Sequence, residues 1–338
     1  MNSLRSGLAA ICGLMVALPL PAAELTTANA LKYFKITPEM ETRLLAGEIL
    51  TRDADELTPD QLSVALTLYV PVPPAKLGDD LRSDWLQVRA ARLARGPLPG
   101  PGSPPVTAAA FDKLPLGDDE VDSLLDARAG HRFNLSADEI ASLQAAAKAA
   151  RGPGSARAAV ARAYKEILAA RANLYFAKGL DGIAPYARED RGKAVPAKGL
   201  RVNTEKFPPL AKFFPEARAA LLKFPGGPAP NSRSQFLWES DRVEDRPDVV
   251  LIHRLSIDRP DATLLAVRQF YVGHSYDSSQ IVAGAVPFHG GSLVFYFNWT
   301  FTDQVTGALS ELKHSIGRSR MRDQILADFQ RLRANFAR

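Results

Sequence analysis

Cysteine is almost absent from this sequence, because Cys12 is the only one among 338 residues. One cysteine excludes an internal disulfide framework and a zinc site built from several thiolates. Long apolar runs are also scarce. The longest lies within MNSLRSGLAAICGLMVALPLPAAE, where about a dozen mostly apolar residues follow Arg5. That run is too short to cross a bilayer, which takes roughly 20 residues.

The N-terminal pattern of one Arg, an apolar stretch and a small-residue end is typical of a secretory signal peptide. We expect residues 1–23 to be this peptide, with cleavage after Ala23. A lipoprotein interpretation of Cys12 is weaker, because the bulky Ile11 precedes it. The remaining chain, 24–338, should be a soluble bacterial protein that is periplasmic or secreted, and it would contain no cysteine.

Neither sign of charge is in large excess. The chain has 42 Lys and Arg against 37 Asp and Glu, a net charge of +5, which falls to +4 without Arg5. The basic residues are spread over predicted helices, including the C-terminal LKHSIGRSRMRDQ, and this favours solvated helix faces. The alternative is a transient contact with an anionic membrane surface or polysaccharide. No recognisable nucleic-acid module occurs, so we expect no nucleic-acid partner.

The clearest pattern is a series of four segments that alternate apolar and other residues and then run into one long amphipathic helix. The four are DVVLIHRLSI, TLLAVRQFYVG, SQIVAGAVPF and SLVFYFNWTF. Alternation of this kind, interrupted by short turns, predicts antiparallel strands. Two earlier segments, GEILTRDAD and LSVALTLYVPV, predict two more strands, which must join the late ones from far away in the sequence.

The segments between these strands are mostly helical in pattern. Thr37 and Pro38 predict a helix start and Gly47 its stop, Ser136 and Glu139 form a capping-box pattern, and Ser155 opens an Ala-rich helix that stops at Gly179. AKLGDDLRSDWLQVRAARL also reads as helical. The cluster GPLPGPGSPPV at 96–106 predicts an exposed connection.

These patterns predict an α+β fold. We expect a curved antiparallel sheet closed by a long C-terminal helix, in a single domain at 24–338, with 96–231 as a mainly helical insertion.

Several blocks carry a resemblance to a known superfamily. GEILTRDAD, LSVALTLYVPVPPAKLGDDL, the C-terminal meander and LKHSIGRSRMRDQILADFQRL together resemble the helix-grip order of the START/SRPBCC superfamily. The resemblance implies a hydrophobic ligand held between the sheet and the last helix, and it includes no catalytic motif. RQFYVGHSYDSS and VFYFNWTFTD also resemble segments of uncharacterised secreted bacterial proteins of similar length.

One histidine falls on a predicted strand among aliphatic residues. His253 shares its side of the strand at 248–257 with Val249, Leu251, Leu255 and Ile257. An imidazole in that position is typical of a buried core residue with a hydrogen-bond partner. The alternative is a polar group inside a ligand pocket.

The segment RQFYVGHSYDSSQ is the densest group of polar side chains. A hairpin turn at Gly273 explains it without any chemistry. The functional alternative places Arg268 and Tyr271 in a cavity and His274 and Tyr276 at its mouth, where they would bind the polar end of an amphipathic ligand. The candidate ligand-binding residues are therefore His253, Arg268, Tyr271, His274 and Tyr276.

Large apolar residues mark the last strand and the last helix. We expect the stripe on the strand to pack beneath the helix; it comprises Leu293, Phe295, Phe297, Trp299 and Phe301. The helix has two stripes, first Val305, Leu309, Leu312 and Ile316, and then Met321, Ile325, Phe329, Leu332 and Phe336. The step between them lies beside Gly317, where the helix can bend or approach the sheet closely.

Catalytic and metal-binding patterns are incomplete. GHSYD has Asp277 where the nucleophile-elbow pattern requires Gly, which disfavours a hydrolase based on Ser275. His274 and Asp277 with His289 would be a metal set only if the next turn lay nearby, and no dense His/Asp cluster supports it. We expect no metal and no cofactor.

Three functions remain open. The first is an exported protein that binds a hydrophobic or amphipathic small molecule, such as a lipid, between the sheet and the last helix. The second is a non-catalytic interaction or scaffold protein of the cell envelope. The third is an enzyme that uses His274 or His253 as a general base, since an imidazole titrates near neutrality. The sequence does not indicate an oligomeric state.

Overall fold

The core of the molecule is one large antiparallel sheet. The computed structural model describes residues 25–52, 54–84, 92–189, 192–227, 229–243 and 246–336, so the predicted signal peptide lies outside the described residues. The strands of the main sheet are β1 (Leu50–Arg52), β2 (Gln61–Val70), β3 (Arg92–Leu98), β6 (Ser232–Val243), β7 (Arg246–Arg259), β8 (Ala262–Val272), β9 (Ser278–Phe288) and β10 (Gly291–Phe301). A separate hairpin comprises β4 (Tyr186–Arg188) and β5 (Gly192–Ala194).

The strand order is β1-β2-β10-β9-β8-β7-β6-β3, so the sheet is open and has β1 and β3 as its edges. The four alternating segments form β7 to β10, as predicted, and neighbours along the chain are neighbours in the sheet. The two early strands join through β2, which pairs with β10 so that Thr67 lies opposite Phe295. The predicted α+β class is therefore confirmed.

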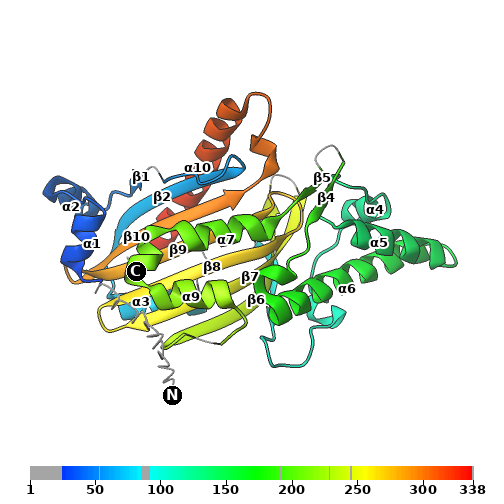
Figure 1. Ribbon diagram of the computed structural model, residues 1–338, viewed down its shortest axis with the longest axis horizontal. Coiled ribbons are helices and arrows are strands. Elements are labelled where there is room, and N and C mark those ends of the chain that lie inside the picture. The colour runs from blue at the N-terminus through cyan, green and yellow to red at the C-terminus, as the bar shows by residue number, and fades with distance from the viewer. Residues whose placement is uncertain are drawn as a thin grey trace, which may run out of the picture.

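Helices cover both faces of this sheet (Figure 1). They are α1 (Thr27–Tyr33), α2 (Pro38–Leu45), α3 (Pro74–Asp84), α4 (Asp118–Leu125), α5 (Ala137–Ala149), α6 (Ser155–Lys178), α7 (Pro196–Lys206), α8 (Pro208–Phe213), α9 (Pro215–Lys223) and α10 (Ser310–Phe336). Short 3-10 turns are η2 (Ala108–Phe111), η3 (Gly179–Gly182) and η4 (Asp303–Val305). The predicted helix starts are confirmed: Thr37 caps α2, and Ser136 and Glu139 form a capping box on α5.

The prediction for residues 92–98 is wrong. The sequence indicated a helix up to Leu93 and an exposed connection from Gly96, but these residues form the edge strand β3. Gly96 lies against the indole of Trp238, and a Cβ atom on this glycine would come within 2.5 Å of the ring nitrogen. Pro97 is tolerated because an edge strand has one row of backbone groups without a partner strand.

The two faces of the sheet have different covers. The first, which we call the helical-layer face, packs against α1, α2 and α4 to α9. The second, the α10 face, packs against α3 and α10, with Leu77 of α3 and Phe329 of α10 among its buried residues. In Figure 1, α7 and α9 lie in front of the sheet and α10 lies behind it.

The aromatic stripe of β10 does not lie beneath the last helix. Phe295 stacks on Phe34, the residue after α1, with ring centroids 3.9 Å apart, and Trp299 meets Phe207 edge to face. Both contacts are on the helical-layer face. The intervening side chains of β10 face α10 instead, and Tyr296 meets the Phe329 ring at 4.8 Å. The sequence identified the stripe correctly but not the layer that covers it.

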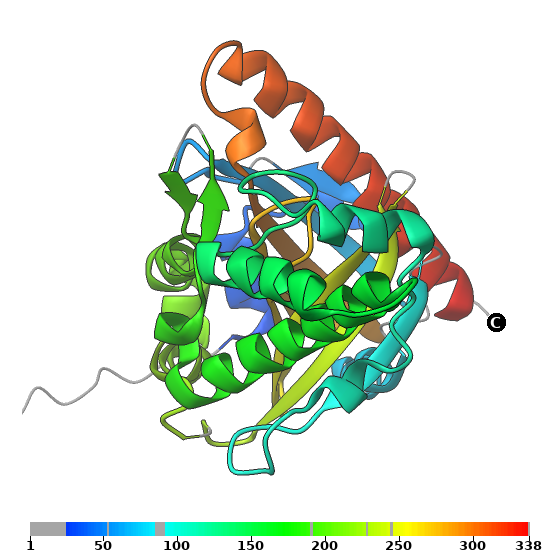
Figure 2. The same cartoon turned by 90° about the vertical axis from the view of Figure 1, so that its right-hand side faces the viewer.

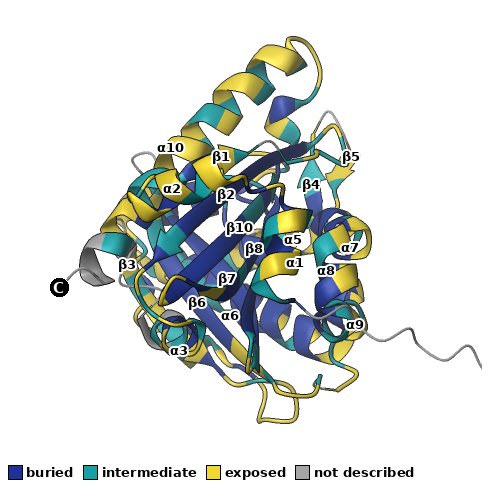
Figure 3. Cartoon of the chain, turned by 90° about the vertical axis from the view of Figure 1, so that its left-hand side faces the viewer, coloured by how far each residue is buried: buried dark blue, intermediate teal, exposed yellow. Residues whose placement is uncertain are grey.

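The buried apolar side chains that α10 packs on the sheet come from its second half. Ile325 and Phe329 are buried, and Gly317 approaches β2 so closely that a Cβ atom would lie 2.8 Å from Leu62. The first predicted stripe is different, because Leu312 and Ile316 are exposed where the helix extends past the sheet (Figures 2 and 3). A place in the core is therefore wrong for Leu309, Leu312 and Ile316, whereas Val305 of the same stripe lies in η4 and is buried. Within the described ranges, no helix has both the length and the apolarity that crossing a membrane requires.

Candidate functional site

Two of the predicted ligand-binding residues lie together in the interior of the helical-layer face. Arg268 on β8 is fully buried, and His253 on β7 is 1% exposed. The Arg268 guanidinium donates to Gln280 Oε1, to the Tyr175 hydroxyl at 3.3 Å and to the Leu221 carbonyl at 3.0 Å. Its fifth N–H donates to Thr204 Oγ1 at 3.1 Å. All five N–H donors of the guanidinium therefore have acceptors from the protein.

The hydrogen bonds around His253 form a chain with a defined direction. Arginine can only donate, so the Tyr175 oxygen accepts from Arg268 and its own proton points to His253 Nδ1 at 2.9 Å. Nε2 of His253 then carries the ring proton and donates to Ser234 Oγ at 3.0 Å. Burial, together with the nearby Arg268 charge, holds the pKa of His253 well below its ordinary value. The imidazole is therefore neutral, and both its nitrogens are engaged.

Tyr271 belongs to a second buried group on the same face. Its hydroxyl lies 3.1 Å from that of Tyr164 on α6, and the Arg171 guanidinium lies over its ring, 4.5 Å from the centroid. Arg171 pairs with Glu139 at 2.5 Å, and both side chains are largely buried. Burial raises the pKa of Tyr271 well above its ordinary value, so the phenol stays protonated. This group joins α5, α6 and β8.

His274 lies in the β8–β9 turn, where Asp248 organises the backbone. The Asp248 carboxylate accepts hydrogen bonds from the backbone N–H groups of His274 and Ser275, each at 3.1 Å. His274 Nε2 lies 3.0 Å from the Pro247 carbonyl, so it carries the ring proton, and Nδ1 accepts from the Ser275 hydroxyl at 3.1 Å. Burial lowers the pKa of His274, an effect that the Asp248 charge opposes.

This serine–histidine pair has the hydrogen-bond polarity of a nucleophile and its base. The space beside it, lined by Asp248, Gly273 and His274 among others, has a volume of only about 10 Å³. That volume holds about one water molecule. The pair therefore organises the turn, and in this conformation no substrate fits there.

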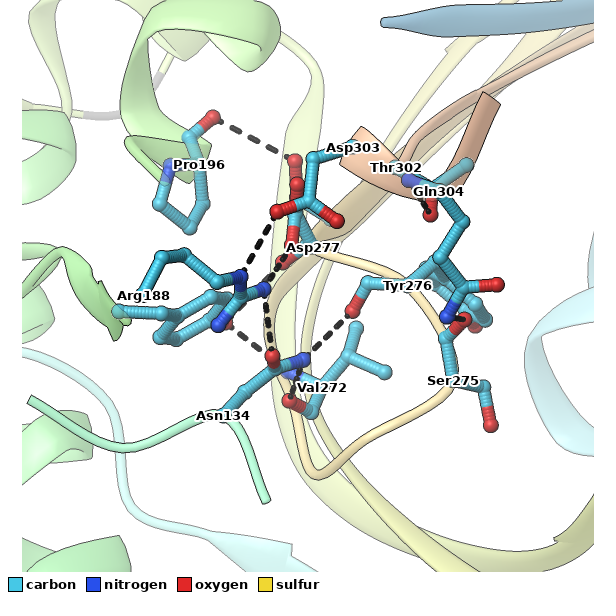
Figure 4. Close-up of polar contacts among 12 residues, drawn as sticks. Asn134, Arg188, Pro196, Val272, Ser275, Tyr276, Asp277, Thr302, Asp303 and Gln304 are labelled. Carbon is cyan, nitrogen blue, oxygen red and sulfur yellow. Dashed lines mark hydrogen bonds and ion pairs between the residues drawn. The ribbon is translucent and has the colours of Figure 1, made fainter. Parts of the chain in front are cut away.

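Tyr276 and Asp277 complete the turn but point in different directions. The Tyr276 hydroxyl donates to Gln269 Oε1 at 2.6 Å, and its ring packs with the α10 face. Asp277 pairs with Arg188 of β4 at 2.7 Å, and Arg188 also contacts Asp303 and Asn134 (Figure 4). Burial raises the pKa of Asp277 to about 7, against the opposing Arg188 charge.

The five candidate residues thus do not meet in one pocket. His253 and Arg268 share one buried group, Tyr271 belongs to another, and His274 and Tyr276 lie in the turn. The metal alternative is wrong for a simple reason: His289 lies in the β9–β10 turn, at the opposite end of β9 from His274 and Asp277. Across the described ranges, no three His, Cys, Asp or Glu side chains are placed to hold a metal ion.

A ligand-sized space lies elsewhere, at the end of the sheet where β9 turns into β10. This groove has a volume of about 560 Å³. It is lined by Thr27, Leu31, Glu41, Pro73, Pro74, Ala75, Pro260, Pro287, Phe288, His289, Gly290 and Gly291, and we call it the proline groove. Two other spaces against the sheet are far smaller: about 10 Å³ beneath α3 and about 30 Å³ beneath α1 and α8.

The proline groove is mostly apolar and has one polar pair at its rim. His289 Nε2 lies 3.9 Å from Glu41 Oε2, and the His289 side chain is 56% exposed. Hydrogen bonds hold the walls together: Thr27 of α1 donates to the Pro287 carbonyl, and Tyr69 of β2 donates to the His289 carbonyl. His289 and Gly290 both have positive φ, 44° and 78°, in a two-residue hairpin turn.

Sequence reasoning missed this groove because its walls come from five separate parts of the chain. The one local signal is the His289-Gly290-Gly291 sequence, which forms the turn between β9 and β10.

No family model, curated protein or solved structure matches this chain.

Proposed function

We propose that this chain binds a small hydrophobic or amphipathic molecule, such as a lipid, in the proline groove. The observation that carries the proposal is the groove itself, whose volume of about 560 Å³ falls in the range of small-molecule sites, about 300 to 1,000 Å³. Four prolines in its lining keep the walls in one conformation and reduce the entropy lost on binding. Glu41 and His289 provide a polar end for a hydroxyl or amino group.

The groove supports this activity better than the space between the sheet and α10. There, Ile325 and Phe329 pack directly on aliphatic side chains and Tyr296 of the sheet, and a ligand would have to displace them.

We also propose that 24–338 is one helix-grip-like domain whose sheet curves around α10, with 96–231 as an insertion. The position of this segment supports the insertion, because it connects β3 and β6, which are adjacent antiparallel strands at one edge of the sheet. Residues 96–98 belong to β3, so the inserted part begins after Leu98. Such a domain could act in the periplasm or outside the cell. Sequencing the N-terminus of the protein isolated from its native cells tests export: a start at Glu24 is expected, and an intact residue 1 would contradict it.

The test of the binding site is to fill the groove. Ala75 lies in the first turn of α3 and lines the groove, so Ala75→Trp should occupy part of its volume. Ala137, in the first turn of α5 and exposed, offers the matched control Ala137→Trp. Native mass spectrometry of the protein purified from its own cells should show a retained small molecule in the wild-type chain and in Ala137→Trp, but not in Ala75→Trp.

Polar substitutions at the rim sharpen this test. Glu41→Gln and His289→Asn each change one member of the polar pair. Asn is chosen at position 289 because it adopts a positive φ readily. We expect each to weaken binding of an amphipathic ligand by about five- to tenfold, the effect of one hydrogen bond. A ligand that is retained equally by Ala75→Trp, or no ligand in any preparation, would contradict the proposal.

A further inference from the structure

We propose that the N-terminal half of α10 is a membrane-docking surface, which inserts Leu309, Leu312 and Ile316 among the headgroups of an anionic lipid bilayer. These three side chains are 73%, 55% and 47% exposed, the most exposed large apolar residues described in the protein. Leu312 and Ile316 are four residues apart and lie on one side of α10, and Leu309 lies in the turn directly before the helix. We call them the α10 stripe.

The α10 stripe points away from the body of the protein. The opposite side of the same helix turns inward, where His314 lies 3.0 Å from both Glu56 Oε2 and the Pro59 carbonyl, and Gly317 abuts Leu62. The helix also extends past the end of the sheet, so its first turns form a projection (Figures 2 and 3). A flat surface can therefore reach the stripe without meeting the rest of the molecule.

The charge around the stripe fits an anionic surface. Residues 309–322 hold four basic side chains and one acidic one, Glu311, for a net charge of +3. Arg320 follows Ile316 at the same helical spacing, one turn nearer the body, and both Arg318 and Arg322 are partly exposed. An apolar tip with arginines behind it is the arrangement of an interfacial helix, whose basic residues reach headgroups while its apolar residues enter the boundary below them.

Two other occupants are disfavoured, one by this charge and the other by the small size of the stripe. A second copy of this chain would bring two segments of +3 together, which repel each other. A protein partner would have to extend the contact well beyond the stripe, since a stable interface takes about 20 to 30 residues on each side. A bilayer needs only a small apolar tip and a basic rim, and the result is a transient contact.

Vesicle sedimentation with the whole chain tests the proposal. We expect binding to vesicles of an equal mixture of phosphatidylcholine and phosphatidylglycerol, at least about tenfold weaker binding to phosphatidylcholine alone, and loss of binding at high salt.

Two pairs of variants separate the apolar and charged contributions. Leu312→Ser with Ile316→Ser should weaken binding by about tenfold or more, because the apolar contact is lost; Leu174→Ser, at a leucine of α6 that is 41% exposed, should leave it unchanged. Arg320→Glu with Arg322→Glu should also weaken it by at least about tenfold. Lys113→Glu with Lys198→Glu, two exposed lysines elsewhere, gives the same change in net charge as a control.

An environment-sensitive dye reports insertion directly. In a Cys12→Ser chain, a nitrobenzoxadiazole label on Leu312→Cys should shift its emission to the blue when anionic vesicles are added, and a label on Leu174→Cys should not. The proposal is overturned by equal binding to neutral vesicles, by equal effects of the two charge-reversal pairs, or by no vesicle binding. Light scattering that shows a dimer abolished by Leu312→Ser would also overturn it, in favour of a second copy.

Discussion

The helices on the two faces of the main sheet are held in different ways. On the helical-layer face, Arg268 of β8 hydrogen-bonds to Thr204 of α7, Leu221 of α9 and Tyr175 of α6, so one buried side chain fixes three helices. On the α10 face, Ile325 and Phe329 hold the last helix by apolar contact. Buried hydrogen bonds are directional and specify one arrangement, whereas apolar burial is not directional.

This difference shows where a partner can bind. The buried polar groups around Arg268 and His253 are the ones that sequence reasoning selected as a ligand site, yet the donors of Arg268 and both nitrogens of His253 already have acceptors or donors within the protein. The two candidate surfaces instead lie where the helical cover ends. One is the proline groove at the end of the sheet, and the other is the stripe where α10 leaves it.

The largest expected effect on stability comes from the buried hydrogen bonds of the helical-layer face. Arg268→Ala should lower the free energy of unfolding by about 5 kcal/mol, because it removes a buried charge-assisted network and leaves its acceptors unsatisfied. Urea denaturation followed by circular dichroism measures this. Arg162→Ala is the matched control, since Arg162 is an arginine of α6 with a side chain 81% exposed, and should change stability by less than about 0.5 kcal/mol. Equal effects of the two substitutions would show that the Arg268 network is not a major support of the helical layer.

Loss of an apolar contact on the α10 face should lower the free energy of unfolding slightly less. Phe329→Ala removes a ring that is 5% exposed and packed on Tyr296, and we expect a loss of about 3 kcal/mol. Limited proteolysis should then cut within α10 before any other helix, because the polar contacts of this helix, such as those of His314 with Glu56 and the Pro59 carbonyl, are less buried than the Arg268 network. Cleavage that begins in α6 or α7 instead would break the comparison.

The Asp277 carboxyl gives a prediction on pH. Its pKa is about 7 in the folded chain and about 3.9 in the unfolded chain, so the folded state binds the proton more tightly. The contribution of this carboxyl to the free energy of unfolding is fully present below about pH 4 and is lost as the pH rises through about 7. Between pH 5 and pH 8 the loss should be about 2.5 kcal/mol.

Asp277→Asn should remove this loss while keeping an acceptor for Arg188. The measurement is the free energy of unfolding of both proteins at pH 5 and pH 8. His253 and His274 have lowered pKa values and contribute in the opposite direction, with stability that rises with pH, but this contribution cancels in the difference between variant and wild type. An unchanged pH dependence in the variant would mean that Asp277 is ionised over the whole range.

Most of the strands could be predicted from the sequence, because alternation is a local property. The segments of β7 to β10 and the capping boundaries of α2, α5 and α6 lie where the pattern placed them. Edge strand β3 could not be predicted, because its Gly96 and Pro97 are strand residues only in the presence of Trp238, which is more than a hundred residues away. The position of each strand in the sheet likewise depends on pairing between distant segments.

The candidate site was harder to predict for a related reason. Alternation groups the residues of one strand by side, but it does not say which layer covers each side. His253 was correctly expected to be buried, and only the functional alternative placed Arg268 inside the protein. Their hydrogen-bond partners Tyr175 and Thr204 come from a different part of the chain. The proline groove joins residues from α1 to β10, so no single segment carries its signal.

The smallest expected effect is also the most informative about α10. Leu312→Ser with Ile316→Ser should change the free energy of unfolding by less than about 0.5 kcal/mol, because both side chains are already exposed in the folded state. The matched measurement is Ile325→Ser on the same helix, which should cost at least about 2 kcal/mol, since Ile325 is buried against the sheet. If the exposed pair proved as costly as Ile325, the first turns of α10 would pack against the protein in solution, and the stripe would no longer be available to a membrane. If the exposed pair costs much less than Ile325, Leu312 and Ile316 do not contribute to the packed core of the protein. Their apolar side chains then have a function outside the core.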